Sequence, residues 1–155
     1  MSKTSSLFAV DGKLSEAIDG FVPRQAQTDM AVAVENTIKN KAPLIVEAGT
    51  GTGKTFAYLA PALLSERKTI VSTGTKNLQE QLFYRDLPLI KKALGSNSKT
   101  ALLKGRANYL CLHRLRQHGG NSMLVDRQTL TELTQVRVWA SSTKTGDMGD
   151  MRSLA

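Results

Sequence analysis

Nine residues, EAGTGTGKT at positions 47–55, constrain the fold of this chain more than any other stretch. They follow the apolar run Pro43-Leu44-Ile45-Val46 and lead into KTFAYLAPALL (54–64), which has the composition of a helix. Three glycines at alternate positions let the backbone curl until its N–H groups point inward. The helix that follows adds its positive N-terminal end. A strand, a glycine-rich turn and a helix in this order predict a phosphate-binding loop.

The predicted loop consists of Ala48, Gly49, Thr50, Gly51, Thr52, Gly53, Lys54 and Thr55. Ala48 stands where the usual pattern begins with glycine, and alanine can serve there if its φ is negative. Lys54 is expected to reach the β- and γ-phosphates of a nucleoside triphosphate, and the Thr55 hydroxyl to bind Mg²⁺, so these two are the candidate catalytic residues. A glycine-rich turn with no ligand would give no reason for Lys-Thr directly after the last glycine.

Apolar and β-branched segments alternate with helical patterns along the chain. We predict strands at 44–48, 68–74 and 99–105. Helices are predicted at 23–40, 54–64, 76–94, 108–118 (stopped by Gly119-Gly120) and 123–140. This alternation predicts an α/β fold of the P-loop NTPase (RecA-like) class, a parallel sheet with flanking helices.

The chain carries a formal net charge of +8, and the excess is concentrated in one stretch. Residues 87–131 contain eight Lys or Arg residues and a single acid, Asp126. Such a stretch suits a polyanion such as nucleic acid, although a solvated basic face explains it equally well. One cysteine excludes an internal disulfide and favours a reducing, cytoplasmic location. No apolar run approaches the ~18 residues of a membrane span.

Three stretches together, EAGTGTGKTFAYLAPAL, VSTGTKNLQEQL and LLKGRANYLCLHRL, resemble the N-terminal part of superfamily 2 DNA helicases of the iron–sulfur class, in the bacterial YoaA/DinG group. The resemblance runs from about Phe21 to about Trp139. It implies an enzyme that couples ATP hydrolysis to 5′-to-3′ translocation on single-stranded DNA, unwinds forked duplexes and takes part in DNA repair or replication.

The resemblance also implies roles for further residues. FVPRQAQTDM matches the family's Q motif, which would make Arg24 and Gln27 part of the ATP site, since a glutamine amide can read the two-sided edge of adenine. Thr73, Thr75, Lys104 and Arg106 match positions beside the DNA, although Thr75 also suits a plain helix cap. Cys111 matches the first of four ligands of a 4Fe–4S cluster. It could serve only if three further cysteines were supplied, because such a cluster needs four thiolates.

Composition indicates a polar lead-in (1–20) and an unpatterned tail (141–155). Between them the resemblance implies a partial ATP-binding lobe (21–106) and the start of an iron–sulfur domain (107–140). No DEAH-type carboxylate pair follows an apolar strand, and Asp11, Asp19, Asp147 and Asp150 all lie in polar surroundings. We therefore expect the remaining helicase domains to be required in cis, and these 155 residues alone not to unwind DNA. The alternatives are a non-catalytic nucleotide or single-stranded DNA binding module and a decayed remnant.

Overall fold

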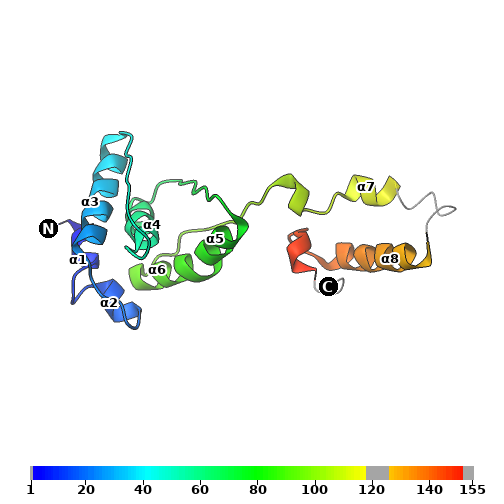
Figure 1. Cartoon of the computed structure of the whole chain (residues 1–155), viewed down its shortest axis with the longest axis horizontal. Helices are drawn as coiled ribbons and strands as arrows, with labels where there is room; N and C mark the ends of the chain where they lie inside the picture. Colours follow the sequence, from blue (N-terminus) through cyan, green and yellow to red (C-terminus); the bar gives the residue numbers. More distant parts are fainter. Residues whose placement is uncertain (1, 118–125, 152–155) are drawn as a thin grey trace. The chain divides into compact units, whose positions relative to one another are not determined.

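The computed structural model describes residues 2–117 and 126–151. The chain divides into two compact units between residues 102 and 103. The first unit contains α1 (Lys3–Leu7), α2 (Lys13–Ala17), α3 (Gln25–Asn40), α4 (Lys54–Leu64), α5 (Lys76–Gln81), the π-helix η1 (Leu82–Asp86) and α6 (Leu87–Leu94) (Figure 1). The second contains the 3₁₀ turn η2 (Arg106–Asn108), α7 (Leu112–Gln117), α8 (Arg127–Ser142) and the 3₁₀ turn η4 (Met148–Asp150).

The core of the first unit is helical. The helix α3 packs along α4, α1 lies against α3, and α6 contacts both α2 and α4. Each of these elements places apolar side chains in one shared cluster, which removes them from water and stabilises the unit. The buried members are Leu7, Phe8, Leu14, Ala31, Ala57, Leu59, Ala60, Leu87, Ile90 and Ala93.

The N-terminal 20 residues, expected from their polarity to be a lead-in, supply part of that core. Leu7, Phe8 and Leu14 are all buried there. The Phe8 ring lies 6.4 Å from that of Phe21, and Phe21 meets the ring of Phe56 on α4 edge to face at 6.5 Å. The segment is thereby packed against the helix that begins at the phosphate loop.

The predicted helices at 23–40, 54–64 and 76–94 are confirmed. Pro61 is buried within α4, and the helix continues to Leu64. The stretch 76–94 forms α5, η1 and α6 in succession, with Pro88 in the first turn of α6. In the second unit α7 and α8 confirm helices within 108–118 and 123–140, while Gly119-Gly120 and residues 123–125 fall outside the described residues.

The predicted strands at 44–48, 68–74 and 99–105 are wrong for this structure. Throughout residues 2–117 and 126–151 no strand ladder forms, and the three segments run as irregular chain (Figure 1). Ile45 is 97% exposed and Ile70 is 90% exposed. A strand exists only where a neighbouring strand accepts its hydrogen bonds, and these segments have no such neighbour here. The parallel sheet is therefore not confirmed.

Candidate nucleotide site

The phosphate loop takes its shape from two glycines with positive φ. Gly51 has a φ of +78° and Gly53 a φ of +76°, a left-handed conformation that side chains with a Cβ rarely adopt. Gly53 is also the N-cap of α4, which begins at Lys54. The free N–H groups of the first helical turn therefore lie at the loop, where an anion can use them.

Gly49 and Gly51 face open space, whereas Gly53 lies against a neighbouring side chain. A Cβ built on Gly49 or Gly51 would meet no atom within 4 Å. A Cβ on Gly53 would lie 2.0 Å from Nε2 of Gln27. The space beside residues 49–51 fits the close approach of a phosphate group, and the space beside Gly53 belongs to a neighbouring side chain.

The two charged or polar residues after the last glycine are both engaged within the protein. The Lys54 ammonium donates to the carbonyl oxygens of Ala48, at 2.8 Å, and Gly49, at 2.6 Å. The hydroxyl of Thr55 hydrogen-bonds to Tyr58, a half-buried residue one turn further along α4. Burial raises the pKa of the Tyr58 phenol, and the bond to Thr55 acts in the opposite direction. A nucleotide would have to replace these bonds with its own.

Arg24 and Gln27, predicted from the Q-motif resemblance, lie beside the same loop. The Arg24 guanidinium donates to the carbonyl of Gly51. Gln27 is 4% exposed, and its Nε2 donates to the carbonyl of Gly53 at 3.0 Å. The structure thus brings both residues to residues 48–55, where they bind the loop's backbone. Reading of an adenine edge by Gln27 stays a prediction.

Thr73 and Thr75 lie at the start of α5. The Thr75 side chain accepts a hydrogen bond from the N–H of Leu78 at 3.3 Å, so it is the N-cap of the helix. Thr73 donates its hydroxyl hydrogen to the carbonyl of Thr75 at 3.2 Å. The helix-cap alternative for Thr75 is confirmed, and contact of either threonine with DNA stays a prediction.

The remaining predicted residues belong to the second unit. Arg106 is exposed on η2, and Cys111 is exposed just before α7. Lys104 instead forms an ion pair with Asp147 at 2.8 Å, with side chains only 7% and 9% exposed. Asp147 was expected in polar surroundings, and no sequence pattern predicted its burial.

The residues present do not fit a 4Fe–4S cluster. The sequence has one cysteine, and a cubane cluster needs four thiolates. Over the described ranges no three His, Cys, Asp or Glu side chains come together as a metal site. Mg²⁺ bound with a nucleotide needs fewer protein ligands, since phosphate oxygens and water complete its shell. Thr55 fits that smaller demand.

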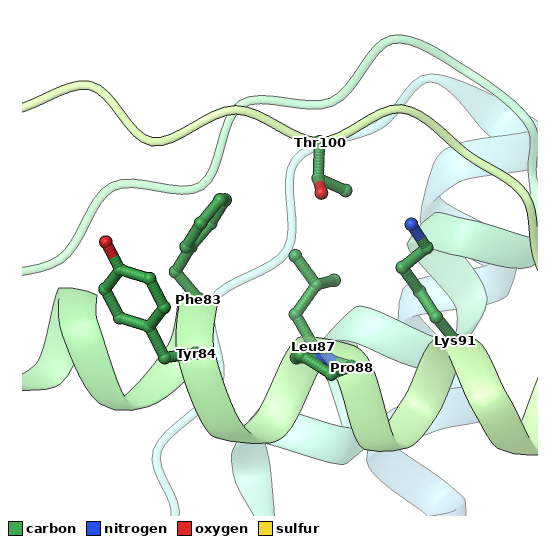
Figure 2. A pocket seen from close by; sticks show the side chains of 6 residues that line it. All are labelled: Phe83, Tyr84, Leu87, Pro88, Lys91 and Thr100. Carbon is green, nitrogen blue, oxygen red and sulfur yellow. The ribbon is translucent and has the colours of Figure 1, made fainter. Parts of the chain in front are cut away.

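A hollow of 390 Å³ opens on the helices that follow Thr75. Figure 2 shows the side chains around it, from η1, α6 and the chain after α6. Its lining residues are Phe83, Tyr84, Leu87, Pro88, Lys91 and Thr100. The Lys91 ammonium donates to the Ser98 carbonyl at 2.6 Å, which ties the chain after α6 back to that helix. None of these residues belongs to the phosphate loop.

Comparison with known proteins identifies the family to which the chain belongs. Residues 27–143 match the family model of the DEAD/DEAH box helicases. The chain therefore belongs to the DEAD/DEAH box helicase family, which implies a P-loop NTPase fold. None of the solved structures matches the chain significantly. Among the helices of the described residues, none is both long and apolar enough to cross a membrane.

Several individual helicases are similar to the chain over most of its length. The chain is 58% identical to the ATP-dependent DNA helicase YoaA of Haemophilus influenzae over 99% of its own length and 24% of the relative's. It is 52% identical to the Escherichia coli YoaA over 96% and 23%. It is 38% identical to the ATP-dependent helicase DinG of Mycobacterium tuberculosis over 86% and 23%. The chain thus spans about a quarter of the length of these curated relatives.

Proposed function

We propose that these residues form the ATP-binding portion of an ATP-dependent DNA helicase of the YoaA/DinG type. The observation that carries the proposal is the loop at residues 48–55, with two left-handed glycines, a helix N-terminus and a lysine ammonium at one place. Mg·ATP is the proposed ligand. Residues 48–53 would hold its phosphates through backbone N–H groups, Lys54 would neutralise their charge, and Thr55 would ligate the metal.

The family and the relatives support DNA as the substrate of the intact enzyme. We propose single-stranded or forked DNA, in a bacterial cytoplasm and at the nucleoid. We propose that movement on DNA requires further domains joined to these residues, which span only about a quarter of the relatives' length. The 155 residues by themselves should therefore bind nucleotide without unwinding DNA. Measuring the intact mass of the protein in its cell, together with the gene sequence beyond codon 155, tests whether such domains are joined to it.

The test of the site is calorimetric titration of the chain with ATP and Mg²⁺. Lys54→Ala should abolish the binding heat, because it removes the ammonium group proposed to neutralise the phosphate charge. Lys68→Ala is the matched control, since Lys68 is exposed and lies outside the loop. Equal affinity of wild type and Lys54→Ala would contradict the assignment of the site.

A further inference from the structure

The second unit contains a buried ion pair that joins two stretches far apart in sequence. Lys104 Nζ lies 2.8 Å from Oδ2 of Asp147, and both side chains are almost fully buried. The other carboxylate oxygen of Asp147 accepts from the N–H of Gly149 at 2.9 Å, so Asp147 also caps η4. An ion pair out of water persists only when its remaining hydrogen-bonding capacity is satisfied, and here the backbone of η4 contributes to that.

Hydrogen bonds from backbone N–H groups also connect the residues around this ion pair. The N–H of Lys104 donates to the Tyr109 hydroxyl at 2.9 Å. Tyr109 and Asp147 form an antiparallel bridge, and the N–H of Leu110 donates to the carbonyl of Gly146 at 2.9 Å. Both ends of the loop 104–110 are therefore tied to residues 146–147.

Arg106 lies between these two ends, on η2, and its side chain is exposed. The charge of Lys104 is compensated by Asp147 and held away from solvent, whereas that of Arg106 is presented to it. A phosphate arriving at this loop would meet Arg106, and could reach Lys104 only by displacing a carboxylate.

We infer that Asp147 is a positioning residue for DNA binding, which acts through Lys104 and Tyr109 to hold the loop that presents Arg106. In this assignment Lys104 is a structural anchor and makes no phosphate contact. The inference rests on the proposed function, since it assumes that the loop faces DNA. It assigns a role to the segment 143–151, for which the sequence pattern gave none.

The first test measures the loop without DNA. Amide hydrogen exchange, followed by NMR on the whole chain, reports the N–H groups of Lys104 and Leu110. Asp147→Asn should speed exchange of both by roughly tenfold or more, because removing one partner of a buried pair leaves the other charge uncompensated. Asp150→Asn is the matched control: Asp150 is exposed, lies three residues on and accepts a hydrogen bond from the Thr145 hydroxyl at 2.7 Å. Unchanged exchange in Asp147→Asn would overturn the inference.

The second test measures affinity for a twenty-nucleotide oligothymidylate by fluorescence anisotropy. Removing an acid from a protein that binds a polyanion should strengthen binding on charge alone. A positioning role predicts the opposite: Asp147→Asn should weaken binding by roughly threefold to tenfold, while Asp150→Asn should not. Tighter binding by Asp147→Asn would mean that the carboxylate only shields Lys104, and would overturn the inference.

Two further variants keep the test decisive. Tyr109→Phe removes one hydroxyl, leaves the ion pair, and should speed exchange at Lys104 more than at Leu110. Lys104→Met in the Asp147→Asn background should weaken binding no further. An additional loss there, with a shallower salt dependence, would make Lys104 a phosphate contact. A wild-type chain that does not bind the oligonucleotide contradicts DNA binding at this loop, and the exchange result then decides the anchoring role of Asp147 alone.

Discussion

The side-chain amide of Gln27 donates to the carbonyl of Gly53 at 3.0 Å, which joins helix α3 to the last glycine of the phosphate loop. The two residues are 26 positions apart in sequence, and Gln27 is buried. This bond fixes the point at which the loop becomes helix α4. The placement of Lys54 and Thr55, the next two residues, therefore depends on α3 as well as on the loop.

Gly53→Ala should be more damaging than Gly51→Ala. Both glycines have a left-handed φ, so both substitutions carry a similar backbone cost of about 1–2 kcal/mol. Only at Gly53 does the new Cβ also collide with Gln27, since Gly51 faces open space. Denaturant unfolding should show a larger loss of stability for Gly53→Ala. Equal losses in the two variants would indicate that Gln27 moves aside without cost.

Thr75→Ala should destabilise the first unit by about 1 kcal/mol, the usual effect of losing an N-cap. The Thr75 hydroxyl accepts from the N–H of Leu78, and alanine offers no acceptor. Thr75→Ser retains the oxygen and should retain most of the stability. Thermal unfolding of the three proteins checks this ranking. If Thr75→Ser were as unstable as Thr75→Ala, the cap would not be the source of the effect.

Arg106→Ala should reduce the salt dependence of oligonucleotide binding. Each phosphate neutralised on a single strand contributes about −0.7 to the slope of log affinity against log salt. Losing one contact should therefore make the slope shallower by about that amount. Arg137→Ala, which removes an exposed arginine from α8, is the control and should leave the slope close to that of wild type. Identical slopes for Arg106→Ala and wild type would exclude a phosphate contact at Arg106.

Stability at acid pH should depend in part on Glu35. Its hydrogen bond with Lys39, at 2.6 Å one turn along α3, lowers the pKa of the carboxyl below its ordinary value. A lowered folded-state pKa adds stability above the unfolded pKa, and this stability is lost as pH falls through the folded pKa. The Tm difference between wild type and Glu35→Gln should therefore favour wild type at pH 7 and shrink at pH 3. A difference independent of pH would mean that the substitution acts through packing.

The phosphate loop and the long helices could be predicted from sequence because their signals are local. Three glycines followed by Lys-Thr specify a turn and the start of a helix, whatever the rest of the chain does. The strands could not be predicted in the same way. Apolar, β-branched residues at 44–48 and 68–74 favour a strand conformation, but a strand also needs a partner, and partners are a property of the whole fold.

Two further features depended on contacts that no local pattern specifies. The apolar residues of the first 20 positions form no long run or extended periodicity, yet Leu7, Phe8 and Leu14 are all buried against distant helices. Asp147 stands in a polar stretch without periodicity, and its burial follows from a lysine 43 positions earlier. Long-range pairs of this kind become visible only when the chain is folded.

The π-helix between α5 and α6 fixes a rotational phase. The N–H of Leu87 bonds to the carbonyl of Leu82, five residues back, so one residue more than usual is contained in that turn. Each residue of an α-helix rotates the side chains that follow by about 100°. The π-turn takes up this rotation: deleting a single residue from 82–86 would place Leu87 four residues after Leu82, so the same bond would close a regular α-helical turn, and Thr75 would keep its orientation relative to Leu87 and Ile90. Homologous sequences with a one-residue gap in this segment should therefore keep the same residues facing the core.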